Sequence, residues 1–342
     1  MKAILLKEFG GPEKLVYEEF EEPKIKEDEV LVRVRACALN RLDLWIRKGA
    51  RGTLKLPHIL GSDVSGEVYE IGKAVSKFNI GDKVMVSPNL SCGKCYYCLS
   101  GQDNLCPEYS ILGAKCHGGY AEYLRIPEVN LISLPSNKSF EEAAAFPLTF
   151  LTAWRMLVTH AKVGPGKTLL IWGGGSGVGS AAIQIAKLFN AKIITTVGRE
   201  DKAPKAKEIG ADYVLNHYKD DIVGEVKKIT KDEGVDIVID HVGEAVWERS
   251  LLSLKKGGIL VNCGGTSGIN GKVEIRRLYW NHLKIIGSTM GTKGELLEAV
   301  KFFAEGKLKP VIHQVFPLRD ASEAHRVMEE GKHFGKLVLK VS

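Results

Sequence analysis

The sequence of 342 residues lacks any long apolar segment and any concentrated basic region. No run approaches the roughly 18 consecutive apolar residues that a membrane-spanning helix needs. The start, Met-Lys-Ala-Ile-Leu-Leu-Lys-Glu, becomes charged too early for a secretory signal. The 48 basic and 41 acidic residues are interspersed, at a net charge of +7, whereas nucleic-acid-binding proteins usually gather basic residues on one face. We therefore expect a cytoplasmic protein with neither a membrane nor a nucleic acid as partner.

Compositional bias is also absent. Hydrophobic residues make up 44% of the chain and charged residues 26%, which is typical of globular proteins and excludes disordered or fibrous architectures. At about 150 residues per domain, the length indicates two domains or one large domain with an insertion.

Cysteine is scarce, and its placement is uneven. Three of the seven cysteines stand alone, whereas the segment 89–107 holds a Cys-x2-Cys-x2-Cys-x7-Cys pattern. A disulfide framework is not expected in a chain this long without a secretory signal. Four thiolates complete a tetrahedral shell, so the pattern predicts one structural zinc per chain; an iron–sulfur cluster and a metal-free thiol cluster are the alternatives. The predicted ligands are Cys92, Cys95, Cys98 and Cys106.

The pattern of apolar and polar residues changes near residue 146. Residues 1–145 carry short alternating runs broken by Gly, Pro and Asn, which predicts a β-rich domain. After a helix expected over 141–157, residues 146–305 alternate apolar strands with helical patterns. Six strands joined by helices make an α/β fold with a doubly wound parallel sheet. The pattern of residues 306–342 predicts a strand, a helix and a strand, and we expect this segment to return to the first domain. The six strands are predicted at 168–172, 192–197, 213–215, 235–240, 258–262 and 283–287.

A glycine-rich turn joins the first of these strands to the helix that follows. The sequence Gly-Gly-Gly-Ser-Gly-Val-Gly at 173–179 leaves backbone amides uncovered at a helix start, which is what a bound pyrophosphate requires. The turn therefore predicts a dinucleotide cofactor. The candidate residues are Gly174, Gly175, Ser176, Gly177, Val178 and Gly179.

The end of the second strand bears on which dinucleotide binds. An acidic residue there accepts from the ribose 2′-hydroxyl of NAD, and a basic one pairs with the 2′-phosphate of NADP. Here Gly198 stands at the expected acidic position, and Arg199 and Lys202 follow. This pattern favours NADP, while NAD stays open if Glu200 or Asp201 contacts the ribose.

Several motifs together resemble the medium-chain dehydrogenase/reductase superfamily, which includes the zinc alcohol dehydrogenases and the quinone oxidoreductases. The resemblance covers essentially the whole chain and rests on the cysteine pattern, the glycine-rich turn, and the segments 81–84, 118–123 and 147–149. It implies a GroES-like catalytic domain at 1–145, a Rossmann domain at 146–305, an active site in the cleft between them, and assembly as a homodimer or homotetramer.

The chain departs from the zinc enzymes of that family at every catalytic zinc ligand. By the resemblance, the three ligand positions fall on Asn40, Ser62 and Leu148. Asn40 and the Gly-Ser-Asp sequence at 61–63 look like the quinone oxidoreductase branch, which works without metal but usually lacks the cysteine lobe.

The resemblance implies hydride transfer between a nicotinamide and a carbonyl, enone, quinone or alcohol. Thr152 is expected to touch the nicotinamide, with Thr149 nearby. Asn40 is expected to donate a hydrogen bond to the substrate oxygen, and Asp63, with Asp43, to orient the polar groups around it. Two alternatives stay open. One is a non-catalytic dinucleotide-binding or sensor protein, and the other is a catalytic zinc with atypical ligands, drawn from Cys37, His58, Asp63, Cys116 and His117.

Overall fold

The computed structural model describes residues 1–49 and 54–341. By its internal contacts the chain forms two compact units: unit 1 is Met1–Leu148 with Thr292–Ser342, and unit 2 is Thr149–Gly291. Among the described residues, no helix has both the length and the hydropathy to cross a bilayer.

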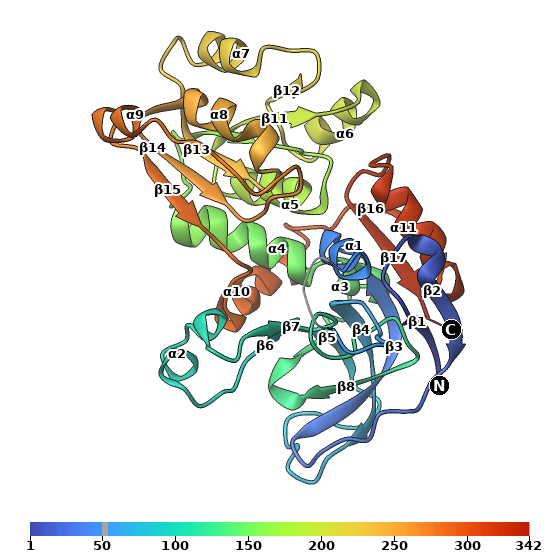
Figure 1. Cartoon of the computed structure of the whole chain (residues 1–342). Coiled ribbons are helices and arrows are strands. Elements are labelled where there is room, and N and C mark those ends of the chain that lie inside the picture. The colour runs from blue at the N-terminus through green and yellow to red at the C-terminus, as the bar shows by residue number, and fades with distance from the viewer. Residues whose placement is uncertain (50–53, 342) are drawn as a thin grey trace. The chain divides into compact units, whose positions relative to one another are not determined.

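Unit 1 is built on a mainly antiparallel sheet of seven strands (Figure 1). Its order is β16-β17-β3-β4-β5-β9, and β8 also pairs with β3. Every β3 residue but Arg33 and Arg35 is buried, because this strand has neighbours on both edges and packs against a helix. The sheet strands are β3 (Glu29–Ala38), β4 (Asp63–Ile71), β5 (Lys83–Val86), β8 (Tyr123–Pro127), β9 (Leu131–Ser133), β16 (Ile312–Pro317) and β17 (Lys336–Lys340).

Helix α3 (Phe140–Ala145) lies on this sheet through small side chains. Ala144 and Ala145 pack against Ala36, Ala38 and Val338, and methyl groups allow the helix backbone to approach the sheet closely. A capping box between Ser139 and Glu142 begins the helix. The other strands and α-helices that lie wholly in unit 1 are β1 (Lys2–Leu6), β2 (Leu15–Glu19), α1 (Arg41–Arg47), β6 (Asn89–Leu90), α2 (Tyr96–Leu99), β7 (Ser110–Ile111), α10 (Lys293–Ala304) and α11 (Ala321–Glu329).

The final segment of the chain joins the sheet of unit 1. Strand β17 pairs antiparallel with β3, and Val338 and Asp63 both lie opposite Ala38. Helix α10 also belongs to unit 1, where Phe303 stacks on Phe146 with ring centroids 4.5 Å apart. The sequence placed this helix with residues 146–305, so the compact units and the predicted domains have different bounds.

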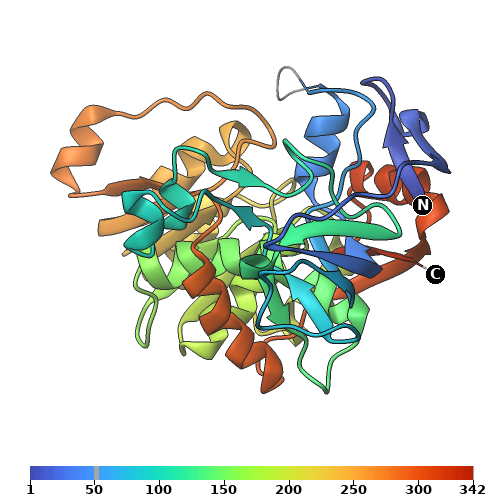
Figure 2. The same ribbon diagram turned by 90° about the horizontal axis from the view of Figure 1, so that it is seen from below.

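Unit 2 is the predicted doubly wound sheet of six parallel strands, in the order β12-β11-β10-β13-β14-β15. All six residues of β13 are buried, as expected for a central strand covered on both faces. The strands are β10 (Thr168–Ile171), β11 (Lys192–Val197), β12 (Tyr213–Asn216), β13 (Val235–Asp240), β14 (Leu254–Asn262) and β15 (Lys284–Gly287). The α-helices that lie wholly in this unit are α5 (Gly177–Leu188), α6 (Ala203–Glu208), α7 (Ile222–Ile229), α8 (Glu244–Ser253) and α9 (Ile275–Trp280). Figure 2 shows α9, in orange, on a segment that extends away from the sheet of this unit.

The prediction of one helix over 141–157 was wrong in its continuity. The segment contains α3, then α4 (Pro147–Trp154), then a π-helix at Arg155–His160. Pro147 has no backbone N–H to continue the preceding helix, but it is well suited to the first position of a new one. The break therefore falls at the proline.

Candidate functional site

A buried cluster in unit 1 joins two of the predicted site residues to a lysine. Asn40 caps the start of α1, Asp63 begins β4, and Lys336 begins β17. The Lys336 Nζ donates to Asn40 Oδ1 (2.6 Å), Asp63 Oδ2 (3.0 Å) and the Leu39 carbonyl (2.7 Å). Three acceptors match the three N–H bonds of an ammonium. Lys336 is 3% exposed, so these bonds replace the water that it would otherwise contact.

Groups at two of the three predicted ligand positions donate to the Asp63 carboxylate. Asn40 Nδ2 donates to Asp63 Oδ2 at 2.9 Å, and the Leu148 backbone N–H donates to Asp63 Oδ1 at 2.8 Å. The Ser62 hydroxyl is fully buried and has no hydrogen-bond partner among the described residues. The Asp63 carboxylate is therefore held by one ammonium and two amides.

A second buried carboxylate, Asp43, fixes the backbone of Asn40. Its Oδ2 accepts from Asn40 N (2.7 Å) and the Tyr120 hydroxyl (3.2 Å), and its Oδ1 accepts from Gly61 N (3.2 Å). Burial raises the pKa of Asp43 to about 6, and these hydrogen bonds limit the rise. Asn40 is thus held at its backbone by Asp43 and at its side chain by Lys336 and Asp63.

Asp43 is one end of a hydrogen-bonded chain through the interior of unit 1. Arg47 NH1 lies 3.3 Å from His325 Nδ1, and His325 Nε2 lies 3.2 Å from the Tyr120 hydroxyl. A guanidinium only donates, so His325 Nδ1 accepts and its proton is on Nε2. Burial and the charge of Arg47 lower the pKa of His325 to about 3, which keeps the ring neutral. The donors therefore run in one direction, from Arg47 through His325 and Tyr120 to Asp43.

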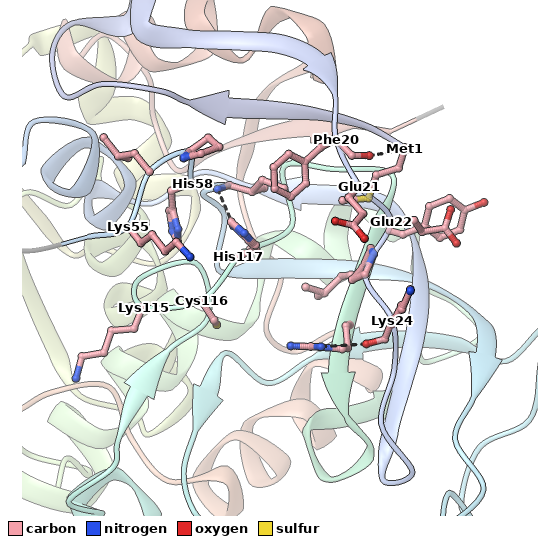
Figure 3. A pocket seen from close by; sticks show the side chains of 18 of the residues that line it. Met1, Phe20, Glu21, Glu22, Lys24, Lys55, His58, Lys115, Cys116 and His117 are labelled. Atoms are coloured by element: carbon pink, nitrogen blue, oxygen red, sulfur yellow. Dashed lines mark hydrogen bonds between the residues drawn. The ribbon is translucent and has the colours of Figure 1, made fainter.

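No three of the atypical metal ligands considered from the sequence have ligand atoms placed to share an ion, among the residues that the structure describes. His58 Nε2 donates to the Gly113 carbonyl at 2.9 Å, and His117 Nδ1 accepts from Ile59 N at 3.2 Å. These two rings, 5.3 Å apart, line a pocket of about 710 Å³ together with Cys116 (Figure 3). Cys37 is buried beside Gly61, where an added Cβ would lie 2.7 Å from the Cys37 Sγ.

The four clustered cysteines converge as predicted. Within residues 1–49 and 54–341, they are the one group of three or more His, Cys, Asp or Glu side chains placed to share an ion, with ligand atoms within 4.8 Å of one another. Sulfur atoms around a tetrahedral zinc lie about 3.8 Å apart for Zn–S bonds of about 2.3 Å. The Cys92 and Cys98 Sγ atoms are 3.9 Å apart, and those of Cys95 and Cys98 are 3.5 Å apart. This donor set fits a structural zinc.

The segment 89–107, which holds the four cysteines and is called the zinc lobe below, is hydrogen-bonded to the start of helix α10. Lys293 N donates to Asp103 Oδ1 at 3.0 Å, and Lys293 Nζ donates to the Ser91 hydroxyl at 3.2 Å. Tyr96 and Leu99, on helix α2 of the lobe, are largely exposed. The lobe therefore has few apolar contacts of its own, and a metal cross-link can supply what its side chains do not.

In unit 2, the glycine-rich turn has the geometry that a pyrophosphate site needs. A Cβ at Gly174 would lie 2.4 Å from Thr195 Oγ1, and one at Gly179 would lie 2.2 Å from the Gly173 carbonyl oxygen. Only glycine fits at these two positions. Ser176 caps α5 by accepting from Gly179 N at 2.9 Å, and its hydroxyl lies 3.0 Å from His241 Nε2. Gly175 precedes this cap, and Gly177 and Val178 begin the helix, so the turn leaves a helix start uncovered.

At the end of β11, a side chain at position 198 would have to displace two neighbouring rings. A Cβ at Gly198 would lie 2.8 Å from the Tyr218 ring and 3.0 Å from His217 Nε2. Burial lowers the pKa of His217, and the positive charges of Arg249 and Lys202 lower it further. Basic side chains from several elements are therefore gathered near this strand end.

Arg199 is already paired at this strand end. Its Nε and NH2 donate to the two carboxylate oxygens of Asp201, both at 3.0 Å. Both side chains are exposed, and exposed ion pairs are weak. A 2′-phosphate at this position has to compete with the Asp201 carboxylate for the guanidinium.

The two predicted threonines lie on the part of α4 that belongs to unit 2. Thr149 and Thr152 are buried, and the Thr149 hydroxyl has no partner among the described residues. The Thr152 hydroxyl lies 3.6 Å from the Met290 sulfur. Their expected roles next to a nicotinamide remain predictions.

Sequence reasoning missed Lys336, Tyr120, His325 and the basic group around His217. Lys336 follows Gly335 at the start of a short strand, and nothing local distinguishes it from a surface lysine. Tyr120 lies within the segment 118–123, whose sequence does not indicate a buried hydroxyl. A search for lysines in apolar strand contexts could have identified Lys336, since lysine is seldom fully buried without a partner.

Comparison with known proteins finds matches along most of the chain. Residues 26–136 match the alcohol dehydrogenase GroES-like domain, and residues 177–305 match the zinc-binding dehydrogenase family. An NAD-dependent alcohol dehydrogenase of Sulfolobus acidocaldarius is 35% identical, with 100% of both chains covered. A human quinone oxidoreductase is 32% identical, over 99% of this chain and 97% of that one. The crystal structure of an NAD-dependent alcohol dehydrogenase is similar at a TM-score of 0.97 and 48% identity, with 100% of both chains covered.

Proposed function

The chain belongs to the medium-chain dehydrogenase/reductase superfamily and is an NAD(P)-dependent oxidoreductase, and on this premise we propose that it transfers hydride between NADP(H) and a carbonyl, enone or quinone without a catalytic zinc. The nicotinamide, when bound, supplies or accepts the hydride. The protein's own residues bind the cofactor and stabilise charge on the substrate oxygen. The one zinc in this proposal is held by the four clustered cysteines.

The observation that carries the proposal is the position of the Lys336 ammonium. It donates to Asn40 Oδ1 and to Asp63 Oδ2, so the oxygen atoms that could bind a metal ion here already bind a positive charge. Zinc prefers thiolate, imidazole and carboxylate ligands, whereas the three positions offer an amide, a hydroxyl and an aliphatic side chain. A divalent ion at this place would also be repelled by the ammonium.

In this proposal, Asn40 donates a hydrogen bond to the substrate oxygen as negative charge develops there. Asp63 and Lys336 hold its side chain, and Asp43 holds its backbone. Thr149 and Thr152 contact the nicotinamide. Hydrogen-bond donors stabilise an oxyanion less than a Lewis acid does, so activated acceptors such as enones and quinones are better substrates than simple alcohols.

We further propose that the cofactor is NADP(H). Gly198 supplies no carboxylate of the kind that selects NAD, and the neighbouring cations Arg199 and Lys202 favour a 2′-phosphate. Three of the curated relatives are named NAD-dependent, and that property belongs to those proteins. NAD(H) is therefore the competing outcome in any cofactor test.

A second candidate function is alcohol oxidation with a catalytic zinc, which the names of the alcohol dehydrogenase relatives favour. The purified protein separates the two candidates. We expect one zinc per chain, NADPH consumption with enones or quinones, and turnover that does not change on mild chelation. Two zinc ions per chain, with activity lost on chelation and restored by zinc while circular dichroism stays constant, would overturn the proposal.

Assembly as a homodimer or homotetramer and a cytoplasmic location remain predictions from the sequence. Light scattering on the purified protein measures the first.

A further inference from the structure

We propose that Lys336 is a positioning residue for the reaction, which holds the Asn40 amide in one orientation and polarises its N–H toward the substrate oxygen. This inference rests on the proposed function, since it assumes that Asn40 meets the substrate. It adds a residue from the last strand of the chain, β17, to the pair formed by Asn40 and Asp63 in the same unit.

The orientation of the Asn40 amide follows from the two groups that flank it. Lys336 only donates, so the atom 2.6 Å from its Nζ is the amide oxygen. Asp63 Oδ2 accepts from the Lys336 ammonium, so we assign the amide atom 2.9 Å from this acceptor as the nitrogen. Turning the amide over would place its NH2 against an ammonium and its oxygen against a carboxylate. The charges of Lys336 and Asp63 therefore determine the orientation of the Asn40 amide, without any contribution from steric packing.

The fixed amide retains one donor that these contacts do not use. The Asn40 Nδ2 has two N–H bonds, and Asp63 is its one hydrogen-bond partner among the described residues. The second N–H is therefore available to an oxygen acceptor. If the amide were reversed, a carbonyl oxygen would take its place and would repel an oxyanion.

Lys336 also strengthens this donor. A cation at the amide oxygen draws electron density from the nitrogen, and hydrogen bonds in a chain strengthen one another. The effect is largest away from water, and Lys336, Asp63 and Asn40 are 3%, 0% and 5% exposed. The Leu39 carbonyl, 2.7 Å from Nζ, takes the third N–H and keeps the ammonium in place. The polarised Asn40 N–H thereby presents a larger partial positive charge to the substrate oxygen.

The rival explanation is that Lys336 only neutralises the buried Asp63. A double-mutant cycle distinguishes the two. We expect Lys336→Met and Asn40→Ala each to lower kcat at least about tenfold, since removing one oxyanion donor commonly costs about 100- to 1,000-fold. The double variant should be no slower than Asn40→Ala alone, because Lys336 acts through that amide. KM for NADPH should change by less than about twofold, because uniform cofactor binding is not affected.

Lys340→Met is the matched control. Lys340 lies on the same strand, but its side chain is exposed and pairs with Glu141 at 3.5 Å, so its loss should leave kcat unchanged. Ethylammonium should restore part of the kcat of Lys336→Ala, whereas the uncharged acetonitrile should not. Asn40→Asp, which leaves the lysine intact and removes the N–H, should be as slow as Asn40→Ala.

Three results would overturn the inference: wild-type kcat in a folded Lys336→Met, independent effects that multiply in the double variant, or full activity in Asn40→Asp. The last of these needs no lysine variant to fold. The proposed function is tested separately, by chelation of the wild type, and loss of activity on chelation would contradict it. A wild-type enzyme that resists chelation, together with an active Lys336→Met, would refute the role of Lys336 alone.

Discussion

Replacing Tyr120 with Phe removes one hydroxyl from the middle of the buried chain that ends at Asp43. That hydroxyl accepts from His325 Nε2 and donates to Asp43 Oδ2, both at 3.2 Å, and the residue is fully buried. Phenylalanine fills the same space, so the change acts through polar groups and creates no large cavity. We expect a lower free energy of unfolding and a pKa of Asp43 that rises further, because the Tyr120 hydrogen bond lowers it.

The size of the effect follows from what each neighbour loses. The His325 N–H is left in the interior without an acceptor, which costs about 1–3 kcal/mol. The Asp43 carboxylate keeps two backbone donors and loses the third, and a hydrogen bond to a charged group contributes about 1.5–3 kcal/mol. Because the two losses share one hydroxyl and do not add fully, we expect about 3 kcal/mol in total. That is a large share of the roughly 5–15 kcal/mol that stabilises a folded protein.

Urea unfolding at pH 7, with the same slope for both proteins, measures this difference. The control is Tyr123→Phe, a half-buried tyrosine in the same segment whose ring contacts Tyr69 at 4.9 Å. We expect the control to change stability by less than about 0.5 kcal/mol. If Tyr120→Phe matched the control, the directed chain from Arg47 to Asp43 would be the wrong description of this interior.

Three further predictions concern pH, cofactor choice and zinc. The pKa of His325 is about 3 in the folded protein against 6.5 as its ordinary value, so its stabilising contribution is present above pH 6.5 and is lost as pH falls toward 3. Relative to His325→Met, the wild type should lose about 3 kcal/mol between pH 7 and pH 4 in urea unfolding, and a constant gap would contradict this. Arg199→Ala should weaken NADPH binding about tenfold and leave NADH unchanged in fluorescence titrations, because a charge-assisted contact to the 2′-phosphate is lost. Asp201→Ala should strengthen NADPH binding by releasing the Arg199 guanidinium, and equal effects on both cofactors would refute this assignment. Cys95→Ser should lose zinc and lower the melting temperature, since metal binding to the folded lobe stabilises it; unchanged metal content and melting would exclude a metal site.

The sequence by itself determined the features whose partners are close along the chain. The four cysteines lie within fifteen residues, and the glycine-rich turn joins a strand to the next helix, so spacing alone defines both groups. The alternation of apolar strands and helices likewise predicted the six-stranded sheet of unit 2, because periodicity reports which residues face a core. The break at Pro147 was not predicted, because the helical pattern continues on both sides of the proline.

Only the tertiary structure decided how the predicted site residues are held. Lys336 is 296 residues from Asn40 and 273 from Asp63, and His325 is 205 from Tyr120, so no spacing rule connects them. A lysine in a sequence is ordinarily a solvated surface charge. Here β17 pairs with β3, which removes water from the Lys336 ammonium and leaves it three protein acceptors. The same burial determines the direction of the Asn40 amide and the tautomer of His325, because a group with no access to water must take the donors and acceptors that the fold places beside it.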